Sequence, residues 1–156
     1  MGGVIADRAE LIRTCARDRE RGLSLVLTNG VFDILHVGHV RALADARTHG
    51  DRLIVAINSD ASVRRLKGAG RPLVPATERA EVVAALGCVD YVLVFDEPDV
   101  RSLLRDLRPD VHAKGRDYTE ATVPERDTAL EVGAKIAIVG DEKNHSVTDI
   151  IGRARG

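Results

Sequence analysis

The sequence lacks several features that mark particular classes of protein. It has no tryptophan and only 3% aromatic residues, too few for a platform on which single-stranded nucleic acid would stack. Its formal net charge is −1, so it lacks the basic excess that is typical of general nucleic-acid binders. No apolar run approaches the roughly 20 residues needed to cross a membrane. We therefore expect neither a nucleic-acid partner nor a membrane partner.

Cysteine is also scarce. Cys15 and Cys88 are far apart and form no CxxC pair, which favours two inert thiols in a reducing compartment. The N-terminal MGGVIADRAE has no basic segment followed by an apolar one, as a secretory signal would have. We expect a cytoplasmic location.

Apolar and amphipathic segments alternate along the chain. Short apolar runs predict strands at 24–27, 51–58, 91–95, 110–114 and 134–139, and helical patterns lie at 4–21, 40–49, 77–86, 98–107, 125–132 and 146–153. The length of 156 residues fits one domain, 1–156, whose residues 1–22 carry a helix packed on the rest. This alternation predicts an α/β fold, a Rossmann-like doubly wound sheet of about five parallel strands.

The stretch from Leu23 to Val40 holds the first candidate site. An apolar run leads into Asn29-Gly30, which predicts a turn, and His36 and His39 follow where a helix begins. Backbone N–H groups and the positive end of the helix dipole favour an anion there. Gly38 allows close approach to the backbone, and residues three apart share a helix face, so the two histidines would grip one phosphate.

Other polar residues follow later predicted strands. Because ligands bind beyond the carboxyl ends of parallel strands, Asp60 after the second strand and Lys114 to Tyr118 (KGRDY) after the fourth should border the same site. The irregular segment 61–75 is rich in basic residues; for Lys67 and Arg71, which are flanked by Gly and Pro, we favour a role in binding phosphate over a solvated surface. Ser146 and Thr148 would form a second anion site at the start of the last helix.

The segment GVFDILHVGHV resembles the GxFDxxHxGH signature of the nucleotidyltransferase family that includes cytidylyltransferases and several adenylyltransferases. The stretches NSDASVRRLKG, KGRDY and HSVTDII make nearly the whole chain similar to the adenylyltransferase domains that form ADP-heptose. A sugar-kinase domain often precedes such domains, and we expect this chain to be the stand-alone form without it. Two departures stand out. Arg116 replaces a glycine of the subgroup's KGGDY, and Ile151 stands where the family's ISSTxIR motif has arginine.

The resemblance implies an enzyme with defined residue roles. It implies catalytic roles for His36, His39 and Lys67 in transferring a nucleoside monophosphate from a nucleoside triphosphate to a sugar phosphate, with pyrophosphate released. The residues expected to bind nucleotide or phosphate are Asn29, Gly30, Phe32, Asp33, Gly38, Lys114, Gly115, Ser146 and Thr148, and those expected to bind the acceptor are Asp60, Arg71, Asp117 and Tyr118. Mg²⁺ would be held mainly by substrate phosphates, with Asp33 as a candidate protein ligand. By analogy, we expect a homodimer.

Three alternatives stay open at this point. ATP with heptose 1-phosphate is the first pair of substrates, and CTP with glycerol 3-phosphate or another small phosphate is the second. A nucleotide-binding module without catalysis is the third, although it would not require both histidines together with Lys67, Asp33 and Lys114. A zinc site at His36, His39 and Asp33 is disfavoured because a fourth ligand is missing.

Overall fold

The computed structural model describes residues 3–141 and 151–154, and these form a three-layer α/β fold. The strands are β1 (Val4–Ile5), β2 (Leu25–Gly30), β3 (Arg52–Asn58), β4 (Tyr91–Phe95), β5 (Val111–Gly115) and β6 (Lys135–Val139). The helices are α1 (Arg8–Glu20), α2 (Val37–Arg47), α3 (Asp60–Lys67), α4 (Ala76–Ala84), α5 (Arg101–Leu107) and α6 (Arg126–Glu131). None of the helices within the described residues is long and apolar enough to cross a membrane.

The sheet is parallel throughout, in the order β1-β4-β3-β2-β5-β6. The predicted Rossmann-like fold is thus confirmed. Helices α2 and α4 cover one face of the sheet, where Leu43 and Val83 join its core, and α1, α5 and α6 cover the other, where Leu11 and Leu104 do so. From β2 the chain winds through β3 to β4 on one side, whereas β5 continues to β6 on the other. The order therefore reverses between β2 and β5, and such a switch point is where open α/β sheets bind ligands.

The beginning of the chain differs from the prediction. The helix expected from residue 4 starts only at Arg8, because the Asp7 side chain caps it by accepting the Glu10 N–H at 2.8 Å. The preceding Val4 and Ile5 form a sixth, short edge strand paired with β4. A pattern of apolar residues cannot reveal this pairing, since it depends on backbone hydrogen bonds to a strand almost 90 residues away.

Three local predictions, about a turn, a cap and a short helical turn, are wrong. Asn29 and Gly30 do not form a turn, because they extend β2 and pair with Ala56 and Ile57 of β3. Thr77, at the start of the helical pattern 77–86, is a residue type that often caps helices and was expected to do so here; Pro75 holds that position instead, with no capping hydrogen bond from a side chain. The irregular pattern of segment 61–75 predicts a short helical turn and then a loop, but the segment begins within the full helix α3 (Asp60–Lys67), which Ser59 caps.

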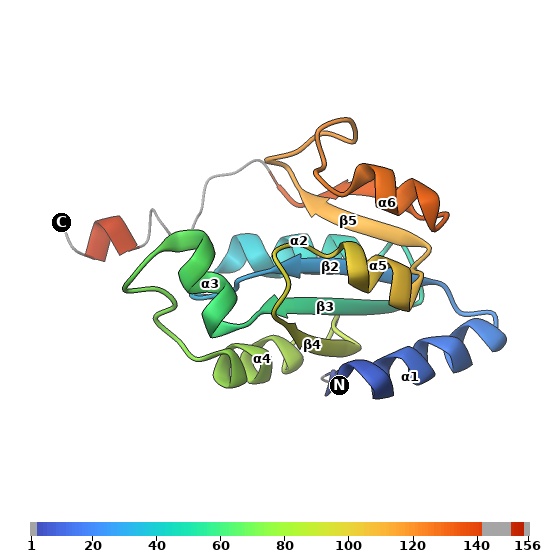
Figure 1. The fold of residues 1–156 in the computed structure, drawn as a ribbon, viewed down its shortest axis with the longest axis horizontal. Coiled ribbons are helices and arrows are strands. Elements are labelled where there is room, and N and C mark those ends of the chain that lie inside the picture. Colours follow the sequence, from blue (N-terminus) through green and yellow to red (C-terminus); the bar gives the residue numbers. More distant parts are fainter. Residues whose placement is uncertain (1–2, 142–150, 155–156) are drawn as a thin grey trace.

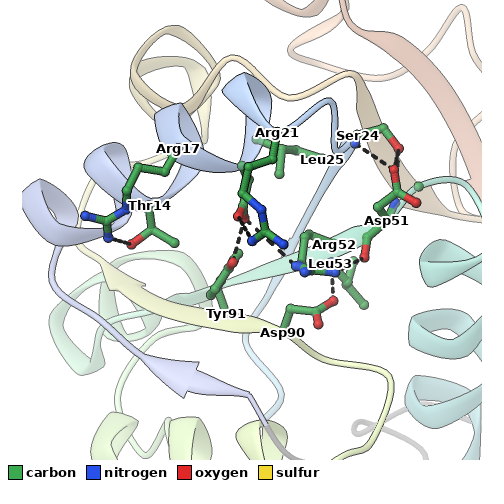
Figure 2. A network of polar contacts seen from close by, with 12 residues as sticks. Thr14, Arg17, Arg21, Ser24, Leu25, Asp51, Arg52, Leu53, Asp90 and Tyr91 are labelled. Atoms are coloured by element: carbon green, nitrogen blue, oxygen red, sulfur yellow. Dashed lines mark hydrogen bonds and ion pairs between the residues drawn. The ribbon is translucent and has the colours of Figure 1, made fainter.

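Carboxylates hold the amino ends of the strands, at the edge of the sheet opposite the switch point. Asp51 accepts the N–H and the hydroxyl of Ser24, and Asp90 accepts the Leu53 N–H at 2.8 Å, as Figure 2 shows. Beside them the Tyr91 hydroxyl donates to the buried Asp18 at 2.5 Å. The polar groups at this edge are thus bound to one another. In Figure 1 the arrowheads of β2, β3 and β5 all point to the other edge, which is the one available to a ligand.

Candidate active site

A cavity of about 260 Å³ lies at the switch point, where β2 and β5 end and α2 begins. Its lining combines the end of β2, the inner side of α2 and the KGRDY segment, and consists of Thr28, Asn29, Gly30, Val31, Phe32, His39, Ala42, Leu43, Lys114, Gly115, Asp117, Tyr118 and Val139. Eight of the residues selected from the sequence are in this list. The tertiary structure therefore joins the histidine motif to the KGRDY segment, which follows it by more than 70 residues.

The two histidines have different places at the start of α2. His36 is the N-cap residue, and its Nδ1 accepts the Gly38 N–H at 3.1 Å. His39 lies within the first turn, and its Nδ1 accepts the His36 N–H at 3.3 Å. A nitrogen that accepts carries no proton, so on each ring the proton resides on Nε2. The Gly38 N–H, expected to face an anion, instead binds the His36 ring.

Of the two histidines of the motif, His39 lines the cavity. The Phe32 ring meets its ring edge-on at 5.1 Å, and the His36 ring stacks on it at 3.9 Å. Burial, and then the neighbouring His36, lower the pKa of His39 to about 4. The ring is therefore neutral at physiological pH, and its Nε2–H is a hydrogen-bond donor suited to a phosphate oxygen.

The position of the Phe32 ring explains why residue 30 is a glycine. Phe32 has a φ of 53°, a left-handed conformation that costs a bulky residue about 1–3 kcal/mol. This conformation places its ring over the backbone of Gly30, where an added Cβ would lie 2.9 Å from the ring. Gly30 is needed because of this close contact and not because of a turn.

Asp33 is engaged by the protein itself. Its side chain is fully buried and accepts the N–H groups of Leu73 and Val74 at 2.9 Å and the Arg71 Nε–H at 3.0 Å. Burial alone would raise the pKa of Asp33, but the two backbone donors and Arg71 outweigh it and hold the pKa below its usual value. Asp33 and Arg71 thus fix segment 71–74 beside the motif, and this geometry does not support Asp33 as a metal ligand.

Asp60 has a similar structural partner, which the sequence analysis missed. Arg79 of α4 is 1% exposed and donates to the carbonyl groups of Val31, Asn58 and Val74 and to the Asp60 carboxylate, at 2.7–2.8 Å. It thereby ties the ends of β2 and β3 to the segment after α3. The sequence did carry a signal for the burial of Arg79, because helical spacing places it on the same face as the buried residues Ala76, Ala80 and Val83 of α4.

Lys114 supplies a cation to the cavity. It is 9% exposed, and its Nζ lies 4.8 Å from the centre of the Tyr118 ring. Burial lowers the pKa of Lys114, while the buried Glu125 carboxylate acts in the opposite direction. A partly desolvated cation interacts strongly with an anionic ligand, because water screens the pair less.

Several residues that the sequence analysis considered for the site are not found in the lining of the cavity. Lys67 is exposed at the end of α3 and does not line the cavity in the part of the chain that the structure describes. Arg116 donates through Nε to the Gly140 carbonyl group at the end of β6. Its guanidinium is thus directed to β6, so replacing glycine in KGGDY does not by itself fill the cavity. Ser146 and Thr148 fall outside the described residues.

A fully buried histidine, His112, was also missed. It lies on β5 behind the cavity, with its Nε2 3.4 Å from Oδ1 of Asn29. Burial, and then the charge of Lys114, lower the pKa of His112 to about 3. The signal in the sequence was a polar residue at an inward position of a predicted strand.

The model of the cytidylyltransferase-like family matches residues 27–153, which include both histidines and the KGRDY segment. The chain belongs to the cytidylyltransferase-like family. The resemblance recognised from the GxFDxxHxGH motif is thereby confirmed.

Other members of this family are similar over most of the chain. A bifunctional protein HldE from Syntrophotalea carbinolica is 49% identical over 136 residues, 87% of this chain and 28% of the relative. The bifunctional protein HldE of a Caulobacter species is 48% identical over 149 residues, 96% of this chain and 30% of the relative. The chain thus spans less than a third of the length of these relatives.

Solved structures share the fold. A lipopolysaccharide core biosynthesis protein from Thermoplasma volcanium superposes with a TM-score of 0.68 at 27% identity, covering 78% of this chain and all of that one. A pantoate-beta-alanine ligase from Francisella tularensis, solved with an ATP analogue and beta-alanine, gives a TM-score of 0.64 over 98% of this chain and 77% of its own. Its identity is 15%, so this second likeness concerns the fold alone.

Proposed function

We propose that this member of the cytidylyltransferase-like family transfers a nucleoside monophosphate from a nucleoside triphosphate to a sugar phosphate and releases pyrophosphate. ATP and heptose 1-phosphate are the proposed pair, and ADP-heptose is the product. The observation that carries the proposal is the cavity at the switch point, where the neutral His39 ring and the buried Lys114 line one site. The similarity to HldE proteins supports the choice of sugar.

The reaction requires no nucleophile from the protein. A phosphate monoester has a second pKa near 6, so the sugar phosphate is largely a dianion at neutral pH. Its oxygen forms a bond to the α-phosphorus of the triphosphate, while the bond from that phosphorus to the bridging oxygen of pyrophosphate breaks in line. The protein positions the two substrates and stabilises the charge that develops.

Several of the described residues at the site have a proposed task. The Nε2–H of His39 donates to an oxygen of the phosphoryl group under attack, and Lys114 offsets the negative charge that the two substrates bring together. His36 orients His39 by stacking on its ring and donating its backbone N–H to it. Asp33 and Arg79 hold the loops around the cavity in place. Roles for Lys67, Ser146 and Thr148 in binding the triphosphate stay predictions.

Mg²⁺ is part of the same proposal. Among the described residues no three His, Cys, Asp or Glu side chains are grouped so that they could hold a metal ion. The Asp33 carboxylate accepts hydrogen bonds from the protein itself. This donor set fits an ion that enters with the nucleotide and is held by its phosphates and by water. We therefore expect the Mg²⁺ complex of the triphosphate to be the substrate.

The second candidate function is cytidylyl transfer to glycerol 3-phosphate. Because the family is described as cytidylyltransferase-like, the experiment below includes CTP as well as ATP. Pyrophosphate release would be measured with Mg²⁺ for ATP and CTP, each with heptose 1-phosphate and with glycerol 3-phosphate. His39→Ala is the blank. His49→Ala is its matched control, because His49 is an exposed histidine just after the end of α2 and does not line the cavity.

Release with ATP and heptose 1-phosphate that is lost in His39→Ala but kept in His49→Ala is the expected result. Release only with CTP would move the protein to the second candidate function. Binding of nucleotide without release from any of the four pairs would favour the non-catalytic module.

The expected homodimer and the cytoplasmic location also stay predictions. Light scattering of the purified chain tests the first, and a monomer at working concentration would contradict it.

A further inference from the structure

The buried His112 pairs with Asn29, a residue of the cavity lining. On the sheet His112 of β5 is in register with Leu27 of β2, and Asn29 lies two residues further along β2, on the same face. His112 is 0% exposed, whereas Asn29 is partly exposed and lines the cavity. The imidazole thus stands directly behind a side chain that a ligand would touch.

The chemistry of the pair fixes which atom donates. The partner of His112 Nε2 is the carboxamide oxygen of Asn29, at 3.4 Å, and a carbonyl oxygen can only accept. Nε2 therefore carries the proton of the neutral ring, and Nδ1, which has no hydrogen-bond partner within the described structure, is left without one. A proton on Nδ1 would be an N–H without a partner, and together with the proton on Nε2 it would make the ring a buried cation. Both are costly, so Nδ1 is more stable without a proton.

Burial, and then the charge of Lys114, lower the pKa of the His112 ring and keep it neutral. Lys114 follows two positions later on the same strand, and its charge disfavours a second cation beside it. Glu125, at the start of α6, is the acidic group on this side that acts on Lys114. A neutral His112 has a single N–H, so it can hold the Asn29 oxygen and has no other proton to offer.

We propose that His112 is a positioning residue that holds the oxygen of the Asn29 carboxamide and thereby directs the Nδ2 amino group to donate to a phosphate group of the substrate in the cavity. The inference rests on the proposed function, since it assigns one more contact to the same site. Lys114 lines this part of the cavity as well, so amide donors and a cation would act on the same anionic group. Both the triphosphate and the sugar phosphate carry such an oxygen.

The kinetic test uses a conservative and a disruptive variant. His112→Leu removes the donor, whereas His112→Gln keeps an N–H that reaches the Asn29 oxygen. We expect kcat/KM to fall about tenfold in His112→Leu, the scale of one hydrogen bond lost from a site, and to recover most of this loss in His112→Gln. A rise in KM for ATP alone would assign the contact to the triphosphate, and a rise for the sugar phosphate alone would assign it to the acceptor.

A double-mutant cycle separates positioning from simple structural support. If His112 acts through Asn29, His112→Leu should cause no further loss of kcat/KM in an Asn29→Ala background. Additive losses, or a His112→Gln variant as impaired as His112→Leu, would overturn the inference. Thermal midpoints of all variants are recorded in parallel, so that a loss due only to unfolding is recognised.

An NMR measurement tests the pairing of His112 with Asn29 without relying on enzymatic activity, so it can fail or succeed independently of the proposed function. The ¹⁵N shifts of the His112 ring should report a neutral Nε2–H tautomer from roughly pH 5 to pH 8. The side-chain amide signals of Asn29 should shift in His112→Leu and not in His49→Leu. An Nδ1–H tautomer or an imidazolium would overturn the pairing, even if pyrophosphate is released. Silence in the pyrophosphate assay together with the expected spectra would count against the proposed substrates and not against the pairing.

Discussion

The rings of His36 and His39 stack with their centroids 3.9 Å apart and their planes 24° from parallel. The same two residues are joined by a hydrogen bond from the His36 N–H to the His39 Nδ1. Stacking and hydrogen bonding together fix the orientation and the tautomer of His39, so that its Nε2–H is aimed by the local backbone. A donor that is already oriented needs no reorganisation when charge develops in the transition state.

The first prediction concerns the loss of this donor. His39→Ala should lower kcat by about a hundredfold or more, by analogy with the removal of one preorganised donor from an oxyanion hole. Initial rates of pyrophosphate release at saturating substrate measure it, and His49→Ala should leave kcat nearly unchanged. An equal fall in both variants would show that the loss is not specific to the cavity.

The second prediction is the pH dependence of the rate. Because the pKa of His39 is lowered to about 4, its neutral, donating form predominates at any pH well above that value. The contribution of His39 to kcat should therefore stay constant through neutral pH and be lost only as the pH falls toward 4. A profile of kcat against pH for the wild type and His39→Ala isolates it. A loss centred near the ordinary histidine value of 6.5 would contradict a buried, neutral ring.

The third prediction concerns acid stability. In the unfolded chain a histidine takes up a proton below its ordinary pKa of 6.5, whereas folded His112 stays neutral down to about pH 3. Between these values the unfolded state binds more protons, so the free energy of unfolding must fall as the pH falls. One such group contributes a slope of about 1.4 kcal/mol per pH unit. Urea titrations across this range should show a shallower slope in His112→Leu than in the wild type.

The fourth prediction tests the buried guanidinium that joins the loops. Arg79→Met should lower the free energy of unfolding by about 3–5 kcal/mol, because it removes the donor to the carbonyl groups of three residues and breaks the ion pair with Asp60. Urea unfolding measures the change. Arg64→Met is the matched control on exposed α3 surface and should change stability by about 0.5 kcal/mol or less. Similar costs for both variants would refute a bracing role for Arg79.

The fifth prediction concerns the cation of the cavity. Lys114→Met keeps the apolar length of the side chain and removes its charge, so the KM for an anionic substrate should rise roughly tenfold or more. Lys135→Met removes an exposed lysine near the other end of the neighbouring strand and should have little effect. Steady-state kinetics at two salt concentrations measures both variants. An unchanged KM in Lys114→Met would remove this residue from the proposed site.

Much of the molecule follows from local sequence patterns. Apolar runs of strand length alternate with helical patterns, and because a buried strand and a helix have different periods, this alternation alone predicted a parallel α/β sheet. The motif around His36 and His39 also predicted a helix that begins beside the end of the first central strand. Because ligands bind at the carboxyl ends of such strands, Lys114 and Tyr118, which follow a later strand, were predicted to lie at the same site. These inferences need only short segments and a general rule of topology.

Other properties depend on partners that lie far away along the chain. Asp33 looked like a ligand for phosphate or metal, but the backbone of Leu73 and Val74 engages its carboxylate. Arg79 and His112 looked like ordinary members of a helix and a strand, and only their burial gives them roles. Local patterns were enough to predict the five strands β2 to β6 and the edge of the sheet that carries the cavity. The tertiary structure decided which polar groups face the cavity and which are used inside the protein, because a buried donor or acceptor must find its partner wherever the fold brings one.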